Sequence, residues 1–312
     1  MTLQALRAGG KRALASALAD LERRPGSDAS LALLDAACRA PEAHVIGITG
    51  PPGVGKSSLC ASLVAIWRRQ GLRVGVIAVD PSSKSSGGAL LGDRVRIVHD
   101  ATDEGVFVRS MAARDRLGGL ADQTLAAMVL MRGLFDRVLI ETVGVGQSET
   151  DVAGVADTVL FCVQPGSGDS LQFMKAGIVE IPHLVIVTKA DLGRAAERAM
   201  ADVAGALSLA SGGDAGWQTR VMAVSSQSGA GLDGVIAAVE AHRGHLLADS
   251  RLVVARHRQA EGWIAESLRD RFGRDGLARL DRLGFDLSLD AGVQPFERLR
   301  ILNRALTMET GK

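Results

Sequence analysis

The sequence predicts an α/β fold in which a mostly parallel sheet is flanked by helices, with a helical extension at each end of the chain. Two observations carry this prediction. Between residues 44 and 224, short apolar runs rich in β-branched residues alternate with longer helical stretches, the pattern of strand–helix–strand units. Outside that region the apolar residues recur mainly at helical spacing. We therefore expect an N-terminal helical extension (1–42), a sheet-containing domain (43–248) and a C-terminal helical arm (249–312).

The N-terminal extension is predicted to contain two helices, separated near residues 25–27. Ser27 or Asp28 is a candidate cap for the second helix. The first helix is rich in Ala, Leu and Arg, as transit peptides are, but it also contains Asp20 and Glu22. Because transit peptides are poor in acids, we favour a folded amphipathic helix over a cleaved signal. Its apolar face is formed by Leu3, Leu6, Leu14, Leu18 and Leu21.

Seven apolar runs predict the strands of the sheet, and ligands of such sheets bind beyond the carboxyl ends of the strands. The runs are residues 45–49, 74–79, 106–108, 137–140, 158–163, 184–187 and 220–224, with helices such as 120–134 and 194–209 between them. The C-terminal arm has helical pattern at 256–272 and 296–306 and a brief alternation at 285–289. It is too small to bury a core alone, so we expect it to pack on the main domain or on a second copy of the chain.

The loop after the first strand carries a complete phosphate-binding motif. Strand, glycine-rich loop, Lys-Ser and helix follow one another, which makes a nucleotide site far more probable than a chance turn. The glycines let backbone N–H groups point at phosphate oxygens at the start of a helix. Lys56 would neutralise the β- and γ-phosphates, and Ser57 would hold Mg²⁺. The candidate phosphate-binding residues are Gly50, Pro51, Pro52, Gly53, Val54, Gly55, Lys56, Ser57 and Ser58. The sequence thus predicts a P-loop NTPase.

A guanine-recognition loop is predicted after the sixth strand. Residues 188–191 read Thr-Lys-Ala-Asp, close to the Asn-Lys-x-Asp motif. The Asp191 carboxylate can accept two hydrogen bonds from guanine, which adenine cannot supply, and the stem of Lys189 would lie along the base. Thr188 replaces the usual Asn, so we expect some loop-bracing hydrogen bonds to be lost. The alternative is that Asp191 only caps a turn. A second base-contacting loop is expected at Ser225, Ser226 and Gln227.

The magnesium and catalytic candidates follow other strands. Glu141 begins a Glu-x-x-Gly segment in which a carboxylate can orient Mg²⁺ and the N–H of Gly144 can sense the γ-phosphate. Asp80 ends the second strand, and Asp93 follows shortly. Either carboxylate could hold Mg²⁺ or the attacking water, and either could simply be a cap. We therefore assign Ser57, Asp80, Asp93 and Glu141 to the metal, and Lys56, Asp80, Asp93 and Glu141 to catalysis. No arginine finger can be assigned from the sequence; Arg94, Arg109 and Arg114 are candidates.

Composition narrows the classes of partner and compartment. The formal net charge is +1, which gives no global electrostatic reason to bind nucleic acid or an anionic membrane. No apolar run is long enough to span a bilayer. Cys38, Cys60 and Cys162 stand alone in the sequence, which fits a reducing compartment and hence a cytoplasmic location. Of the six histidines only His242 and His245 are close in sequence, and a solvated helix explains that pair.

Several longer motifs resemble the MeaB/ArgK-type GTPases associated with methylmalonyl-CoA mutase. The resemblance covers the N-terminal helices and the whole nucleotide domain and is fainter in the arm. Residues 115–116 read Asp-Arg where that family more often has Gly-His. The most specific match is Glu-Thr-Val-Gly-Val-Gly-Gln-Ser-Glu. The matching segments are residues 47–57, 80–83, 87–94, 108–111, 117–120 and 141–149.

The resemblance implies a homodimeric, metal-dependent GTPase that acts as a G-protein chaperone. Such a protein would bind GTP or GDP with Mg²⁺, assist loading of adenosylcobalamin into methylmalonyl-CoA mutase, and protect or reactivate that enzyme. The resemblance also implies dimerisation through the arm and an additional switch loop at residues 164–175 that communicates with the mutase. None of this client biology follows from spacing or composition.

Two other functions remain open from the residues alone. A small-molecule kinase also uses a P-loop and Mg²⁺, but it needs an acceptor pocket with a base, and the chain has no clear one. A metal-insertion GTPase for a nickel enzyme should have clustered Cys or His, and the histidines are scattered.

Overall fold

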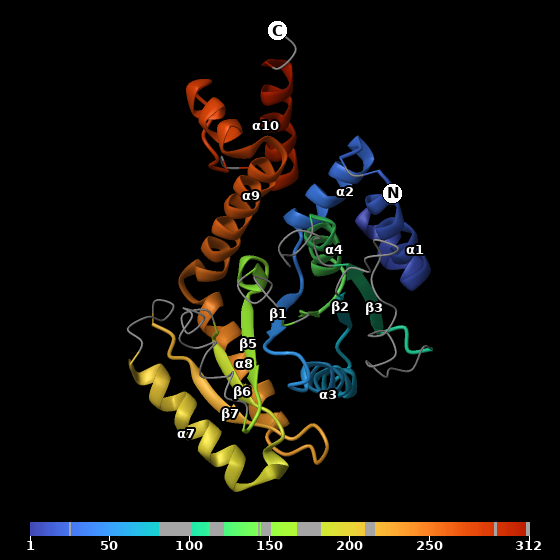
Figure 1. Ribbon diagram of the computed structural model, residues 1–312. Helices are drawn as coiled ribbons and strands as arrows, with labels where there is room; N and C mark the ends of the chain where they lie inside the picture. The colour runs from blue at the N-terminus through green and yellow to red at the C-terminus, as the bar shows by residue number, and fades with distance from the viewer. Residues whose placement is uncertain are drawn as a thin grey trace, which may run out of the picture.

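One sheet of seven parallel strands runs through the computed structural model, in the order β3-β2-β4-β1-β5-β6-β7 (Figure 1). The predicted fold class and all seven predicted strands are thereby confirmed. The structure describes residues 1–24, 26–80, 102–112, 122–142, 144, 151–166, 182–209, 216–289 and 292–309. The strands are β1 (His44–Thr49), β2 (Val74–Asp80), β3 (Val106–Ala112), β4 (Arg137–Glu141), β5 (Thr158–Val163), β6 (Leu184–Val187) and β7 (Arg220–Ala223).

The helices cover both faces of the sheet and extend beyond it at one end. No helix among the described residues combines the length and the apolar character that crossing a membrane requires. The helices are α1 (Leu3–Arg23), α2 (Asp28–Arg39), α3 (Lys56–Arg69), α4 (Asp122–Arg132), α7 (Arg194–Leu209), α8 (Leu232–Leu247), α9 (Arg251–Arg282) and α10 (Pro295–Glu309), with short 3₁₀ turns η1 (Val152–Gly154), η3 (Ala190–Leu192) and η4 (Ala248–Ser250).

Successive strand residues point to opposite faces, and the two faces belong to different apolar clusters. On β1, Val45 belongs to the cluster under α4, while Ile46 and Ile48 belong to the cluster under α3 and α8. Toward the β7 edge of the sheet, Ala196 and Val203 of α7 form a third apolar cluster with residues of β5 and β6. The strand residues of this cluster are Phe161, Val163, Val185 and Val187. Because both faces are covered, the strands are continuously apolar, as the sequence predicted.

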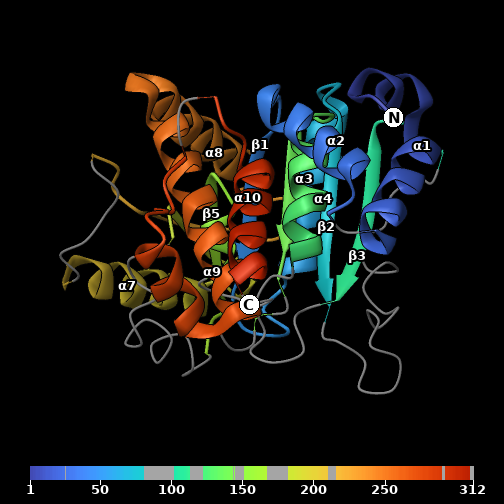
Figure 2. The ribbon, with the colours of Figure 1, turned by 90° about the horizontal axis from the view of Figure 1, so that it is seen from above.

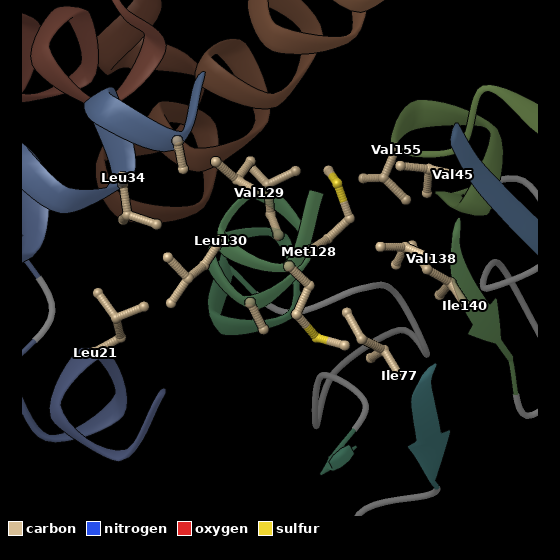
Figure 3. Close-up of a cluster of buried hydrophobic side chains, with 14 of the residues drawn as sticks. Leu21, Leu34, Val45, Ile77, Met128, Val129, Leu130, Val138, Ile140 and Val155 are labelled. Carbon is tan, nitrogen blue, oxygen red and sulfur yellow. The ribbon is translucent and has the colours of Figure 1, made fainter. Parts of the chain in front are cut away.

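The N-terminal extension packs on α4. The apolar face of α1 is buried as predicted, and the Ser27 side chain caps α2 by accepting a 3.3 Å hydrogen bond from the Ser30 backbone N–H. In Figure 3, Leu21 and Leu34 of these helices approach Leu130 on one side of α4, while Met128 faces the strands. The helices therefore form a third layer over the sheet.

The C-terminal arm (α9 and α10) packs against the same layer. Its buried residues Trp263, Leu268 and Leu302 join the cluster that contains α1, α2 and α4, and the rings of Trp263 and Phe296 lie 4.9 Å apart. Figure 2 shows α10 on the same side of the molecule as α2 and α4. The expectation that the arm packs on the main domain is confirmed. Residues 285–289, where the sequence alternates, form no strand.

Candidate nucleotide-binding site

The phosphate loop connects the central strand β1 to α3, at the carboxyl edge of the sheet. Gly50, Gly53 and Gly55 have φ angles of 133°, 73° and 105°, a region that residues with a Cβ rarely adopt. At Gly50 a Cβ would also meet the Cys162 carbonyl oxygen at 2.3 Å. The loop therefore needs glycine at its first position both for backbone conformation and for its close approach to β5.

Lys56 is buried and its ammonium lies inside the loop. Its Nζ donates hydrogen bonds to the carbonyl oxygens of Gly50 at 2.7 Å and Pro51 at 3.0 Å. An ammonium at this position is ready to exchange carbonyl partners for phosphate oxygens, because phosphate is the stronger, charged acceptor. The geometry supports the predicted role of Lys56.

Ser57 and Glu141 meet at the predicted magnesium position. The Ser57 hydroxyl donates a 2.5 Å hydrogen bond to Oε1 of Glu141, which is 6% exposed. Glu141 ends β4, beside β1 and β2. A hydroxyl and a carboxylate oxygen are the hard ligands that Mg²⁺ prefers, so the donor set fits this metal.

Gly144 lies directly against the phosphate loop. Its φ is 77°, and a Cβ there would come within 1.8 Å of the Gly50 carbonyl oxygen and 2.6 Å of Lys56 Nζ. Glycine is thus required at the position that was predicted to sense the γ-phosphate. Its backbone therefore lies close to the phosphate loop and to Lys56.

Two of the predicted carboxylates are only partly located. Asp80 is the last residue of β2, beside β4, so its backbone reaches the same edge of the sheet as Glu141. Asp93 lies outside the described residues, as do Arg94, Arg114, the segment 145–150 and most of the predicted switch loop 164–175. Arg109 donates a hydrogen bond to Glu22 of α1, which directs it away from the phosphate loop.

The base-recognition loop is tied to the phosphate loop by Thr188. Its hydroxyl lies 2.7 Å from the Val54 carbonyl oxygen and 3.0 Å from that of Val163. The short hydroxyl therefore still braces the phosphate loop directly, although a threonine side chain has fewer hydrogen-bonding groups than an asparagine. Lys189 follows with φ 55°, a left-handed conformation that is uncommon for a residue with a side chain and that often marks a functional turn.

Ser225 orients the carboxylate that would read the base. Its hydroxyl donates a 2.6 Å hydrogen bond to Oδ1 of Asp191, and this bond holds the pKa of Asp191 below its usual range. The second predicted loop thus meets the first through Ser225. Gln227 is exposed and Ser226 half-buried at the same edge, while Ser58 is exposed on α3.

Gln164 is a site residue that the sequence analysis did not assign to the nucleotide. Its Oε1 accepts a hydrogen bond from Nζ of Lys189. The signal that could have found it is positional, since Gln164 directly follows β5, between the strands that carry the phosphate loop and the base loop. The residues gathered at this edge come from β1, β4, β5, β6 and β7, as expected for a parallel sheet.

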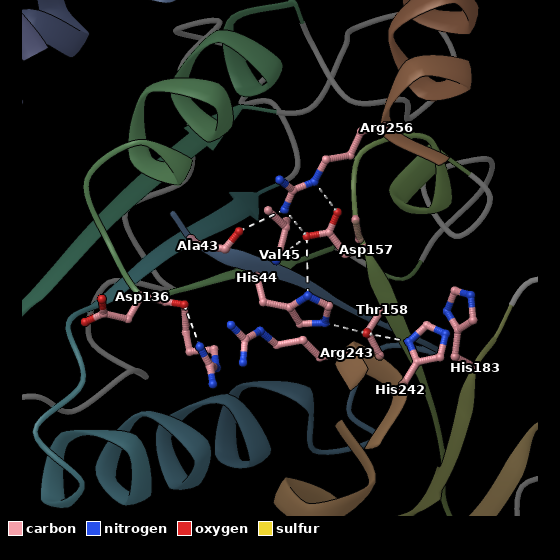
Figure 4. A network of polar contacts seen from close by, with 12 residues as sticks. Ala43, His44, Val45, Asp136, Asp157, Thr158, His183, His242, Arg243 and Arg256 are labelled. Carbon is pink, nitrogen blue, oxygen red and sulfur yellow. Dashed lines mark hydrogen bonds and ion pairs between the residues drawn. The ribbon is translucent and has the colours of Figure 1, made fainter. Parts of the chain in front are cut away.

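A second polar cluster lies at the opposite, amino ends of β1 and β5 (Figure 4). Arg256 of α9 binds Asp157 with both Nε and Nη2, at 2.8 and 2.6 Å, and the Val45 backbone N–H donates to the same carboxylate at 2.7 Å. Burial alone would raise the pKa of Asp157, but these hydrogen bonds and the Arg256 charge hold it below the usual value. This ion pair attaches the arm to the sheet.

Histidines continue this cluster into the protein interior. The Thr158 hydroxyl lies 2.7 Å from both His44 Nε2 and His242 Nδ1. Burial lowers the pKa of His44 to about 4 and that of His242 to about 2. His242 is 0% exposed, so the interpretation of His242 and His245 as a solvated pair is wrong for His242. Its ring is enclosed by His183 and Trp217, which are distant in the sequence.

Within the described part of the chain, no group of three or more His, Cys, Asp or Glu residues is arranged to hold a metal ion. The rings of His183, His242 and His245 pack on one another and on Trp217, and burial lowers the pKa of His242. The nickel-insertion alternative therefore gains no support from these residues.

Comparison with known proteins places these features in a family. Residues 14–278 match the family described as methylmalonyl-CoA mutase-associated GTPase MeaB. A Pyrococcus horikoshii protein whose name describes a GTPase is 47% identical over 190 residues, covering 61% of this chain and 60% of the relative. The mouse mitochondrial methylmalonic aciduria type A homolog is 38% identical over 222 residues, covering 70% of this chain and 54% of the relative. The chain thus spans less than two thirds of the length of either relative.

A solved structure resembles the chain along nearly its whole length. The crystal structure of a protein titled LAO/AO transport system kinase superposes with a TM-score of 0.70 and 27% sequence identity, covering 99% of this chain and 96% of that one. The similarity therefore includes the helical extensions as well as the sheet.

Proposed function

The chain belongs to the MeaB family of methylmalonyl-CoA mutase-associated GTPases, and from this premise we propose that it is a G-protein chaperone for an adenosylcobalamin-dependent mutase. The protein is a P-loop GTPase that binds guanine nucleotides. The proposed client is methylmalonyl-CoA mutase or a related acyl-CoA mutase. Nucleotide hydrolysis would gate adenosylcobalamin loading and protect or reactivate that enzyme.

The observation that carries the switch function is the bond between Ser225 and Asp191. A carboxylate oriented by a neighbouring hydroxyl at 2.6 Å would accept hydrogen bonds from the ring N–H and amino group of guanine. The hydrogen bond from Thr188 to Val54 connects this base-recognition loop to the phosphate loop. A site built in this way supports recognition of the whole nucleotide.

For hydrolysis, we propose in-line attack of water on the γ-phosphate. Lys56 would neutralise charge that develops on the phosphate oxygens, and the Gly144 N–H would donate to the γ-phosphate. Ser57 and Glu141 would hold Mg²⁺, with Asp80 and Asp93 as further candidates. When bound, Mg²⁺ would supply positive charge that stabilises the negative charge of the phosphate oxygens. Of the finger candidates, Arg109 is bonded to Glu22, and we propose that turnover is slow and is accelerated by the client.

The proposed division of the chain assigns residues 43–248 to the GTPase and 249–312 to a dimerisation arm, with 1–42 as an N-terminal extension. The family supports a homodimer, and a cytoplasmic location is supported by the free cysteines, of which Cys60 and Cys162 are buried. Nothing in the net charge of +1 favours nucleic acid or membrane partners.

The site assignment is tested by GTP hydrolysis of Lys56→Ala. We expect the rate to fall about 100-fold or more, because a charge that stabilises the transition state is lost. Lys11→Ala, on α1 and distant from the phosphate loop in the sequence, is the matched control and should keep the wild-type rate. Hydrolysis by Lys56→Ala at the wild-type rate would overturn the assignment.

The client is tested by pull-down of the purified mutase with the full-length chain, in the presence of GDP or of a non-hydrolysable GTP analogue. We expect capture that depends on which nucleotide is bound. Equal capture without nucleotide, or none in any state, would reject the chaperone proposal while leaving the GTPase assignment intact. Recovery of a nickel enzyme from an extract would favour the metal-insertion alternative instead.

A small-molecule kinase remains the second candidate, because the solved structure that covers 99% of this chain carries a kinase title. Release of inorganic phosphate from GTP without an added acceptor would favour the switch. Formation of GDP only when an acceptor is added, with transfer of the γ-phosphoryl group to that acceptor, would favour the kinase.

A further inference from the structure

A cavity of about 480 Å³ lies between α4, η1, α9 and the segment before α10. It is separate from the nucleotide site, since its walls include Arg256, which binds at the amino ends of β1 and β5. This volume lies within the range of pockets that enclose small organic ligands. Apolar walls are provided by Leu125, Val129, Val155 and Phe296.

The charged residues that line this cavity are all basic. Arg132, Arg256 and His257 contribute to it, and no Asp or Glu is present among its described lining residues. Arg256 is bonded to both oxygens of Asp157 and to the Ala43 carbonyl. His257 lies 3.2 Å from Glu261, one turn along α9. Both therefore have acidic partners outside the cavity.

Arg132 has no such partner. Its side chain interacts with the Cys38 thiol, which also lines the cavity, but it forms no ion pair with a carboxylate of the described chain, and its Nε is inaccessible to solvent and has no hydrogen-bond partner. Asp157 acts on it electrostatically, but that carboxylate is already bonded to Arg256 and to the Val45 N–H. Burial lowers the pKa of Arg132, and the charge of Arg256 lowers it further. An uncompensated guanidinium in an apolar cavity is costly unless an anion pairs with it.

We propose that this cavity binds a monocarboxylate with an apolar chain, whose carboxylate pairs with Arg132. One excess positive charge matches one carboxylate, and the planar guanidinium matches carboxylate geometry with two parallel hydrogen bonds. A phosphate monoester would bring nearly two negative charges for the single unpaired arginine. The apolar walls of the cavity would contact the hydrocarbon chain of the ligand. This site is additional to the proposed GTPase and chaperone function and does not depend on it.

The test uses octanoate as the probe and octan-1-ol as its uncharged counterpart, each titrated calorimetrically into the full-length protein. We expect octanoate to bind at least ten-fold more tightly than octan-1-ol, the factor that a charge-assisted hydrogen bond supplies. Arg132→Gln should remove that ten-fold preference and leave octan-1-ol binding unchanged. Arg69→Gln is the matched control, because Arg69 also ends a helix, is exposed, and lies outside the cavity.

Arg132→Lys is the control for misfolding. It keeps the positive charge but loses the planar pair of N–H donors, so it should retain part of the preference for octanoate over octan-1-ol. GTP hydrolysis by Arg132→Gln should equal that of the wild type, which separates this test from that of the nucleotide site. Equal affinity of the wild type for the two probes, or no binding of octanoate, overturns the proposal. If sedimentation instead shows that Arg132→Gln converts dimers to monomers while octanoate does not bind, the anion is a carboxylate of a second copy and the proposal is wrong.

Discussion

The hydroxyl of Thr188 donates to the carbonyl oxygen of Val54 across 2.7 Å, so the loop that reads the base is attached to the loop that holds the phosphates. Both residues are buried. A single hydroxyl therefore couples two loops that are far apart in the sequence. This contact explains how threonine can serve where an asparagine is more usual.

Thr188→Val is expected to weaken GTP and GDP binding about ten-fold, because it leaves the buried Val54 carbonyl without its donor. Equilibrium titration with a fluorescent guanine nucleotide measures the effect. Thr188→Ser keeps the hydroxyl and should bind nearly as the wild type does. Thr219→Val, which removes a hydroxyl bound to the Pro182 carbonyl, is the control outside the site and should leave affinity unchanged. Wild-type affinity in Thr188→Val would contradict the coupling of the two loops.

Asp191→Asn is expected to reduce GTP affinity about 100-fold, because an amide cannot accept both hydrogen bonds from guanine. The same variant should gain affinity for xanthosine triphosphate, which has a carbonyl where guanine has its amino group. Ser225→Ala should show a smaller loss, since the Asp191 carboxylate remains but loses the hydroxyl that orients it. Competition between the two nucleotides reads out this exchange, and unchanged preference in Asp191→Asn would refute the assignment of the base loop.

Glu141→Gln is expected to raise the Mg²⁺ concentration needed for half-maximal GTP hydrolysis about ten-fold or more, because the carboxylate charge beside Ser57 is lost. Nucleotide affinity in the absence of Mg²⁺ should stay near the wild-type value. A Mg²⁺ titration of the initial rate distinguishes this from general damage. If Mg²⁺ dependence is unaltered while the rate falls at every concentration, Glu141 has a different role.

Arg256→Gln is expected to lower the free energy of unfolding by about 3 kcal/mol or more, because Asp157 would remain buried without its ion-pair partner. The Asp157 side chain is only 1% exposed. Arg258→Gln, exposed on the same helix, should change stability by less than about 0.5 kcal/mol. Urea denaturation at neutral pH compares the two variants, and equal stabilities would show that Arg256 does not anchor the arm.

Stability should fall between pH 7.5 and pH 5 because of the buried histidines. The folded pKa values of His44 and His242, about 4 and about 2, lie below the unfolded value near 6.5. The unfolded chain therefore binds protons first as the pH falls, and at pH 5 each histidine costs about 2 kcal/mol. His242→Gln should flatten the dependence measured by urea denaturation. Identical pH profiles for wild type and variant would exclude His242 as a cause.

The sheet and the phosphate site could be predicted because local sequence encodes them. Each strand is a continuous apolar run, and the P-loop is a contiguous motif that one parallel strand and one helix suffice to position. Glu141 and Asp191 were also predictable, because parallel strands bring their carboxyl ends to one edge.

Contacts between distant segments could not be predicted in the same way. The environment of His242 depends on His183 and Trp217, which approach it only after α8 packs on the sheet. The pairing of Gln164 with Lys189 and the anchoring of α9 at Asp157 likewise join residues from different parts of the chain. Sequence periodicity gives the buried face of one element, but it does not give the partner that covers that face.

The two ends of β1 lie at two different polar sites. Gly50 borders one end of this six-residue strand, at the phosphate loop, and His44 forms the other, beside the attachment point of the arm. A strand of that length spans roughly 20 Å. The chain also offers a covalent path between the two ends, since only residues 145–156 separate Gly144 from Asp157. That path ends at η1, where Gln259 of α9 holds the carbonyls of Ala153 and Ala156 at 3.0 and 2.8 Å. Strand β1 thus fixes the distance between the phosphate loop and the attachment point of the arm, and twelve residues of chain join Gly144 to that same attachment point.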